Sequence, residues 1–198
     1  DGQATDPEFL ATLRDRSDVP LRIAYQGVEG SYSHLFTMTR SGDQPARDLL
    51  AGQRVDTPLQ PFGGAEQICW SPDGKRLCYT AKRVTDPEQS TDSGLYVANA
   101  DGTGEHVLLT EGMPGFDQDP VWSPDGKLLA FGSMARGGFE ADRLRLMLHD
   151  VATGKNEELL PDFDASVHGV QWSRDGKQLF FTVETEGTTQ LFRCTIAE

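Results

Sequence analysis

Serine and histidine are the residue types of this sequence best suited to nucleophilic or acid–base catalysis, and they stand side by side in Gly-Ser-Tyr-Ser-His at 30–34. Neighbours on a strand point to opposite faces, so Ser33 and His34 are poorly placed to act as a catalytic pair. The histidines show neither HxxxH nor HExxH spacing, and no Gly-x-Ser-x-Gly nucleophile elbow occurs. We therefore expect no catalytic residue, no metal site and no cofactor in this chain.

Charge and hydropathy limit the classes of partner. The formal net charge is −13, and an acidic surface of that size repels phosphate backbones, so we expect no nucleic-acid partner. No apolar run approaches the length of a membrane span, so we expect no membrane partner either. These totals do not set the compartment, although we favour the periplasm over the cytoplasm of a bacterium.

The cysteines have no spacing typical of a zinc site or of a disulfide framework. Their number is odd and none belongs to a CxxC pair. Cys69 and Cys78 each lie inside an apolar, strand-like run, so we interpret them as small core residues.

An internal repeat is the strongest signal that the sequence carries. WSPDGKRLCYT begins at Trp70, WSPDGKLLAFG at Trp122 and WSRDGKQLFFT at Trp172, so the motif recurs about every 50 residues. A second apolar element follows each motif in phase, beginning at Gly94, Leu144 and Leu191, and the first two of these contain their own glycine turn. HLFTMTRSGDQPARDLL from His34 matches this second element, and RSDVPLRIAYQ from Arg16 resembles the first in decayed form.

Each repeat reads as four short antiparallel strands. Ser-Pro-Asp-Gly is a tight turn in which Pro fixes φ, Asp bonds nearby backbone and Gly takes a positive φ. Runs such as LLAF and QLFF are apolar at consecutive positions, so the strands are covered on both faces, as in sheets stacked around an axis. The fold class predicted is all-β, a β-propeller fragment of about three and a half four-stranded blades, with approximate repeats 16–68, 69–120, 121–170 and 171–198.

Two further expectations concern local structure. The recurring Trp is a buried ring wedged between adjacent blades or, less often, a ring on which a ligand stacks. A helix is expected only over Pro7–Asp15, where Asp6 is a candidate cap and Pro7 stands in the first turn.

Parts of the sequence resemble two kinds of known protein. The twelve residues from Ala24 to Leu35 resemble the opening motif of prephenate dehydratases, but that family continues as alternating strands and helices and this chain continues as β repeats. The Trp-Ser-Pro-Asp-Gly-Lys repeats resemble propeller blades of the prolyl oligopeptidase family and of the periplasmic Tol translocation protein. Connecting strings such as YSHLFTMTR, STDSGLYVANADG and LTEGMPGFDQDPVWSPDGK are similar to the bacterial dipeptidyl-peptidase type of the first family.

That resemblance implies a function and partners. The chain is expected to be the non-catalytic propeller part of a serine exopeptidase of the dipeptidyl or acylaminoacyl type, shaping and gating peptide access to a separate α/β-hydrolase domain. Its expected partners are that hydrolase domain, the missing propeller blades and a peptide substrate, with self-association through open blade edges. The alternative is a stand-alone Tol-type propeller that acts as a periplasmic protein-interaction module.

Propeller topology divides the connections between two rims. The turn rim holds the short, similar Asp-Gly turns. The loop rim holds long, dissimilar connections, at 51–67, 81–93, 111–119, 133–142 and 161–168. Function usually lies on long loops held by a rigid scaffold, so we expect the loop rim to face the hydrolase domain and the peptide.

The candidate substrate-binding residues lie on the loop rim. They combine an aromatic ring with both signs of charge: Arg136, Phe139, Glu140, Asp142, Arg143 and, as a weaker candidate beside two glycines, Glu66. The carboxylates among them are expected to bind the free α-amine of a peptide. The alternative for the 136–143 segment is a solvated loop whose Glu, Asp and Arg side chains pair with one another.

Overall fold

A computed structural model describes residues 21–24, 32–60, 63–85, 87 and 90–196. The helix expected over Pro7–Asp15 and most of the decayed repeat element after Arg16 lie outside these residues. Within them the fold is all-β, as predicted, and the helical structure is a single 3-10 turn, η2 (Ala65–Gln67). None of the described residues forms a helix with the length and apolar character needed to cross a membrane.

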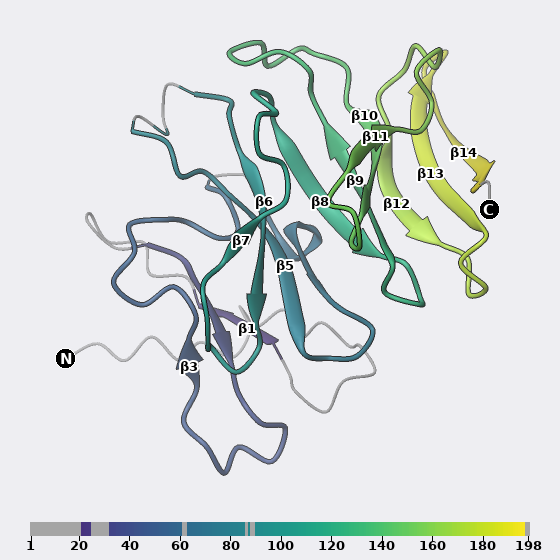
Figure 1. The fold of residues 1–198 in the computed structure, drawn as a ribbon. Coiled ribbons are helices and arrows are strands. Elements are labelled where there is room, and N and C mark those ends of the chain that lie inside the picture. The colour runs from purple at the N-terminus through teal and green to yellow at the C-terminus, as the bar shows by residue number, and fades with distance from the viewer. Residues whose placement is uncertain (1–20, 25–31, 61–62, 86, 88–89, 197–198) are drawn as a thin grey trace.

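Four antiparallel sheets lie side by side in the order in which the chain forms them (Figure 1). The first contains β1 (Leu21–Ala24), β2 (His34–Thr37) and β3 (Arg47–Asp48). The second contains β4 (Ile68–Trp70), β5 (Arg76–Ala81), β6 (Gly94–Asn99) and β7 (Val107–Leu108). The third contains β8 (Asp117–Trp122), β9 (Leu128–Ser133), β10 (Arg145–Asp150) and β11 (Asn156–Glu158). The fourth contains β12 (His168–Trp172), β13 (Gln178–Thr185) and β14 (Thr188–Thr195).

Within each sheet the strands pair in the order in which the chain makes them, which is the meander of a propeller blade. The innermost strands β4, β8 and β12 are neighbours across the sheets. A bulge between Gln118 and Val121 breaks the register of β8 against β9, and β12 has a similar irregularity between His168 and Gln171.

The repeated turns have the geometry that their residues predict. In the second sheet, Ser71 Oγ donates to Asp73 Oδ1 at 2.6 Å and accepts from the backbone N–H of Arg76 at 3.0 Å, while Asp73 Oδ1 accepts from the N–H of Lys75 at 3.1 Å. The same bonds recur in the turns that begin at Ser123 and Ser173. Strands bracket each of these turns, which confirms the predicted architecture.

Neighbouring turns also touch one another. Gly126 and Gly176 have left-handed backbone, with φ of 72° and 71°. A methyl group on Gly126 would lie 3.6 Å from Cδ of Pro72, and one on Gly176 would lie 3.5 Å from Cδ of Pro124. The glycines of these two turns therefore lie close to the proline of the preceding sheet's turn.

Three apolar clusters fill the spaces between the sheets. Trp70, Leu35 and Tyr79 belong to the cluster between the first and second sheets. Trp122 belongs to the cluster between the second and third, and Trp172 packs against the cluster between the third and fourth. All three rings hold equivalent blade positions and are wedged between blades, as predicted. Trp172 Nε1 donates to the carbonyl of Val121 at 3.0 Å, whereas Nε1 of Trp70 and of Trp122 is buried without a partner.

Candidate substrate-facing rim

The long connections of the loop rim run between the second and third strands of a sheet or from one sheet to the next. In the structure they span residues 49–67, 82–93, 109–116, 134–144 and 159–167. The fourth sheet is an exception, because β13 and β14 are joined by the two-residue turn Glu186–Gly187, with φ of 50° and 71°. The sequence therefore places long loops on this rim for the second and third sheets but not for the fourth.

Asp142 organises the loop over residues 134–144. Its Oδ2 accepts from the backbone N–H groups of Ala135 and Arg136 at 3.0 and 2.9 Å. Its Oδ1 accepts from the Arg136 guanidinium at 2.8 Å and from the N–H of Arg143 at 3.0 Å. These donors hold the pKa of the Asp142 carboxyl well below its usual range, the Arg136 side chain contributing most. The Asp142 carboxylate is thus engaged by its own loop.

The other predicted side chains of this loop separate into two groups. The Arg136 guanidinium lies 4.1 Å from the centre of the exposed Phe139 ring, so these two residues and Asp142 form one contact group. Arg143 turns away from them: it pairs with Glu158 of β11 at 2.7 Å and donates to the carbonyl of Phe163. Glu140 is exposed at the tip of the loop.

Two loops of the rim are joined by a hydrogen bond between neighbouring sheets. The N–H of Gly138 donates to Oγ1 of Thr91 at 2.6 Å, which connects the 134–144 loop to the 82–93 loop. At the bases of the loops, next to the strands, Ser93 N–H donates to the carbonyl of Gly115 at 3.1 Å. There too, Met134 N–H donates to the carbonyl of Phe116 at 3.0 Å. The rim of the second and third sheets is therefore held as one surface.

Sequence reasoning missed Asp119. This residue lies in the bulge of β8 with a φ of 55°, a left-handed conformation that is uncommon for residues other than glycine. Its Oδ1 is buried without a hydrogen-bond partner. Burial, together with the nearby charge of Glu66, raises the pKa of Asp119 to about 6. The available signal was Asp-Gln-Asp at 117–119, two acids expected at the end of the 111–119 loop, whereas the structure places them in the inner strand β8.

Glu66, the weaker of the predicted candidates, is therefore the one whose charge acts on a second carboxylate. It stands in η2 just before β4, and Asp119 lies in the inner strand of the next sheet. The Glu66 side chain is exposed, and its Oε1 accepts from the N–H of Gly64 at 2.7 Å. Among the described residues, no hydrogen bond or ion pair joins the Glu66 side chain to the 136–143 segment.

Ser33 and His34 do not bond to each other, in line with the strand geometry. His34 Nδ1 lies 2.8 Å from Oδ2 of Asp48 and Nε2 lies 3.1 Å from the carbonyl of Gln53. Ser33 is buried, and its Oγ accepts from Gln60 Nε2 at 3.3 Å. This histidine therefore holds β3 and the chain after it against β2.

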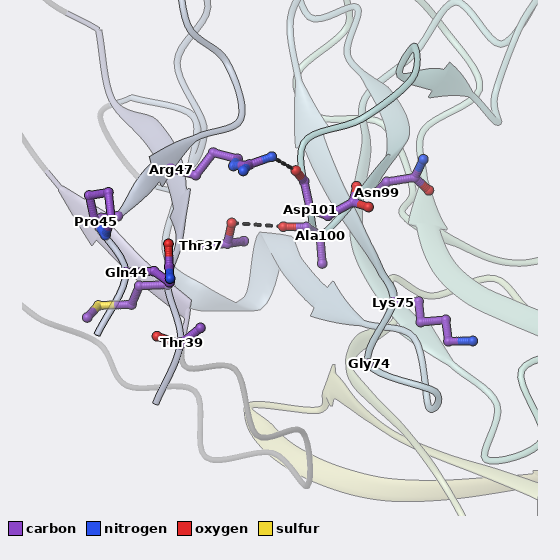
Figure 2. A pocket seen from close by; sticks show the side chains of 12 residues that line it. Thr37, Thr39, Gln44, Pro45, Arg47, Gly74, Lys75, Asn99, Ala100 and Asp101 are labelled. Carbon is purple, nitrogen blue, oxygen red and sulfur yellow. Dashed lines mark hydrogen bonds between the residues drawn. The ribbon is translucent and has the colours of Figure 1, made fainter. Parts of the chain in front are cut away.

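A surface pocket of about 810 Å³ lies at the turn rim, between the first and second sheets (Figure 2). Figure 2 shows Thr37 and Arg47 reaching from one wall toward the opposite wall, where their side chains donate to the carbonyls of Ala100 and Asp101. The lining contains none of the predicted site residues. The Thr37 and Arg47 side chains that line it bridge the two sheets, which is a structural role.

Comparison with known proteins finds relatives of similar sequence. No family model matches it. It is 38% identical over 152 residues to dipeptidyl-peptidase 5 of Porphyromonas gingivalis, a match that covers 76% of this chain and 22% of that protein. It is 40% identical over 104 residues to dipeptidyl-peptidase 5 of Porphyromonas endodontalis, which covers 52% of this chain and 15% of that protein. The described residues form propeller blades, and the chain is similar in sequence to the dipeptidyl-peptidase 5 proteins. It spans about a fifth of the length of these relatives.

Solved structures agree on the fold. The chain matches a puromycin-hydrolyzing peptidase of Mycobacterium tuberculosis with a TM-score of 0.69 and 14% identity, covering 96% of this chain and 30% of that one. It matches TolB of Acinetobacter baumannii with a TM-score of 0.61 and 18% identity, covering 90% and 38%. These likenesses show the propeller fold, and the similarity to the dipeptidyl-peptidase 5 proteins rests on the sequence matches.

Proposed function

We propose that this chain is the non-catalytic propeller portion of a serine exopeptidase, and that its loop rim shapes and gates peptide access to a separate hydrolase domain. The observation that carries the proposal is the 38% identity to a dipeptidyl-peptidase 5 over 76% of the chain. The loop rim supports it, because long loops on a rigid scaffold are where binding residues concentrate. The partners proposed are the hydrolase domain, further propeller blades and a peptide.

The contact between Gly138 and Thr91 is the feature on which gating is best tested. Thr91→Val keeps the shape of the side chain and removes the acceptor of the 2.6 Å hydrogen bond between the two loops. In the complete peptidase, this variant is expected to raise kcat/KM for long peptides several-fold relative to a dipeptidyl chromogenic substrate. Labelling of the hydrolase serine by a fluorophosphonate is expected to stay unchanged, and this chain alone is expected to take up no such label. If the ratio of kcat/KM for long peptides to kcat/KM for the dipeptidyl substrate equals that of the unmodified enzyme, the gating role is rejected.

Recognition of the free α-amine of the substrate is the second part of the proposal. Among the predicted carboxylates, Asp142 is engaged by its own loop, whereas Glu140 and Glu66 are exposed. Loss of a hydrogen bond to a charged group costs about 1.5–3 kcal/mol, or about 10- to 100-fold in kcat/KM. We expect Glu140→Gln or Glu66→Gln to show that loss for a free-amine dipeptide substrate but not for its N-acetylated analogue. If neither does, the amine-anchor role is wrong while the assignment of the rim stands.

The Tol-type alternative is less well supported. The likeness to TolB is at 18% identity and shows the fold alone, whereas the sequence matches are to peptidases. A complete protein whose further sequence holds only additional blades, with no nucleophile elbow, would favour the alternative.

A further inference from the structure

Cys69 and Cys78 stand directly opposite each other on adjacent strands. The register of β4 against β5 pairs their Cα atoms, between the pairs Ile68–Tyr79 and Trp70–Leu77. Directly opposed residues of antiparallel strands have Cα atoms about 4.5–5.5 Å apart, which lies within the range of about 4.4–6.8 Å that a disulfide spans. The backbone therefore already meets the main geometric requirement for a covalent link.

Both side chains also point to the same face of the sheet. Cys78 belongs to the apolar cluster between the second and third sheets, and Cys69 packs against the same cluster. The residues on either side of Cys78 on β5, Leu77 and Tyr79, belong instead to the cluster on the opposite face of the sheet. Burial, with the Cys69 thiol beside it, raises the pKa of the Cys78 thiol well above its ordinary value. Both thiols are free in the structure.

We propose that Cys69 and Cys78 form a site of oxidative modification, at which a small-molecule disulfide such as oxidised glutathione converts the two thiols into a reversible cross-strand disulfide between β4 and β5. The inference is independent of the proposed peptidase function. The third cysteine, Cys194, lies on β14 in the fourth sheet and is not part of this site.

The difference in burial between the two thiols sets the order of the steps. Cys78 is fully buried, whereas Cys69 is partly exposed and is the thiol that the reagent meets. The Cys69 thiolate attacks one sulfur of oxidised glutathione, forms a mixed disulfide and releases one reduced glutathione. The Cys78 thiolate then attacks Sγ of Cys69, forms the protein disulfide and releases the second glutathione. Two protein thiols lose two electrons and two protons, and one glutathione disulfide gains them.

The first test is made on the whole chain. After exposure to oxidised glutathione, the intact mass should fall by two hydrogen atoms, and thiol titration in denaturant should fall from three thiols to one. Tryptic digestion without reductant should yield the peptide 55–75 joined to the peptide 77–82, and dithiothreitol should separate them. A link that includes the peptide 194–198, which contains Cys194, or three thiols remaining, would overturn the proposal.

Single variants test the order of attack. Cys78→Ser should stop at the mixed disulfide and gain the mass of one glutathione on Cys69. Cys69→Ser should gain none at position 78, because the buried Cys78 thiol cannot meet the reagent. Cys194→Ser is the matched control and should form the 69–78 link as the unmodified chain does. Glutathionylation of Cys78 in the folded Cys69→Ser variant would contradict the assignment.

A last variant separates the effect of the fold from that of proximity along the chain. In Cys78→Ala with Leu77→Cys, the second cysteine moves by one residue and therefore to the opposite face of β5. The folded variant should not link to Cys69, whereas in denaturant it should link as readily as the unmodified chain. If the shifted variant does not fold, peptide mapping of the unmodified chain still decides the proposal.

Discussion

Ser93 and Asp117 exchange two hydrogen bonds across the second and third sheets. Ser93 Oγ donates to the carbonyl of Asp117 at 2.9 Å and accepts from the N–H of Asp117 at 2.9 Å. The Asp117 carboxyl is thereby held in the interior, where neither oxygen has a hydrogen-bond partner of good geometry. Burial raises its pKa to about 7, and nearby Asp92 adds to this; the Ser133 and Thr110 hydroxyls and the charge of Arg145 oppose it.

Asp117→Asn is expected to change how stability depends on pH. Between its ordinary value of 3.8 and about 7, the folded state keeps a proton on Asp117 that the unfolded state has lost. The contribution of Asp117 to stability therefore falls as pH rises through this window and is constant above it. One pKa unit corresponds to about 1.4 kcal/mol, so the variant should gain about 3 kcal/mol over the unmodified chain between pH 4.5 and 8. Urea unfolding at a series of pH values measures this difference.

Asp125→Asn is the matched control for that measurement. Its partner Ser123 and the Lys127 N–H lower the pKa of Asp125, so its contribution is present above its ordinary pKa and is lost as pH falls. Between pH 4.5 and 8 the stability of Asp125→Asn should therefore run parallel to that of the unmodified chain, whereas that of Asp117→Asn should diverge from it. Parallel curves for Asp117→Asn and the unmodified chain would show that burial does not raise this pKa.

The serines of the repeated turns are expected to matter in proportion to their burial. Each accepts a backbone N–H, and a buried donor left without an acceptor costs about 1–3 kcal/mol. Ser71→Ala and Ser123→Ala should each lower the free energy of unfolding by about that amount, because Ser71 and Ser123 are 2% and 1% exposed. Ser173→Ala should cost less, and the exposed Ser41→Ala almost nothing. Equal losses at all four positions in urea unfolding would contradict this account.

Asp142→Asn is expected to loosen the 134–144 loop without unfolding the sheets. The substitution removes the charge that accepts two guanidinium and three backbone N–H donors. Tryptic cleavage after Arg136 should become several-fold faster, as measured by limited proteolysis. Glu140→Gln should leave the rate unchanged. Equal cleavage rates for both variants would mean that Asp142 does not organise the loop.

The edge of the fourth sheet is expected to make the isolated chain associate with itself. β14 is exposed along most of its length, and Leu191 on it is 72% exposed. An unpaired edge with an apolar side chain is a template for pairing with another chain. Sedimentation should show association that Leu191→Lys reduces. A monomer at high concentration would refute this.

The turns were predictable and the acidic contacts were not, for a physical reason. Ser71, Pro72, Asp73 and Gly74 specify their turn through bonds among themselves, so the string contains its own geometry. The approach of Asp119 to Glu66 depends on a bulge and on the packing of two sheets, which no local pattern encodes. Likewise Cys69 and Cys78 were each predictable as core residues, but their apposition requires the register of β4 against β5.

The candidate site was predictable to a smaller extent than the fold. The sequence places Arg136, Phe139 and Asp142 in one loop, and they do contact one another. It does not show that Asp142 is used by backbone N–H groups or that Arg143 turns toward Glu158. These details depend on the conformation of the loop, in which two arginines of equal charge take different partners: Arg136 pairs with Asp142 and Arg143 with Glu158.

The contact of Gly126 with Pro72, repeated by Gly176 with Pro124, has a consequence for how such a chain can grow. The third sheet presents Gly126 to the preceding turn and Pro124 to the following one, so the junction is head-to-tail, although Arg174 stands at the proline position of the fourth sheet. A tandem copy of the gene segment for one blade would arrive with both halves of this junction already matched to its neighbours. Blade number is therefore open to change by duplication or loss of whole units, whereas a change of a few residues within a unit would disturb two junctions at once.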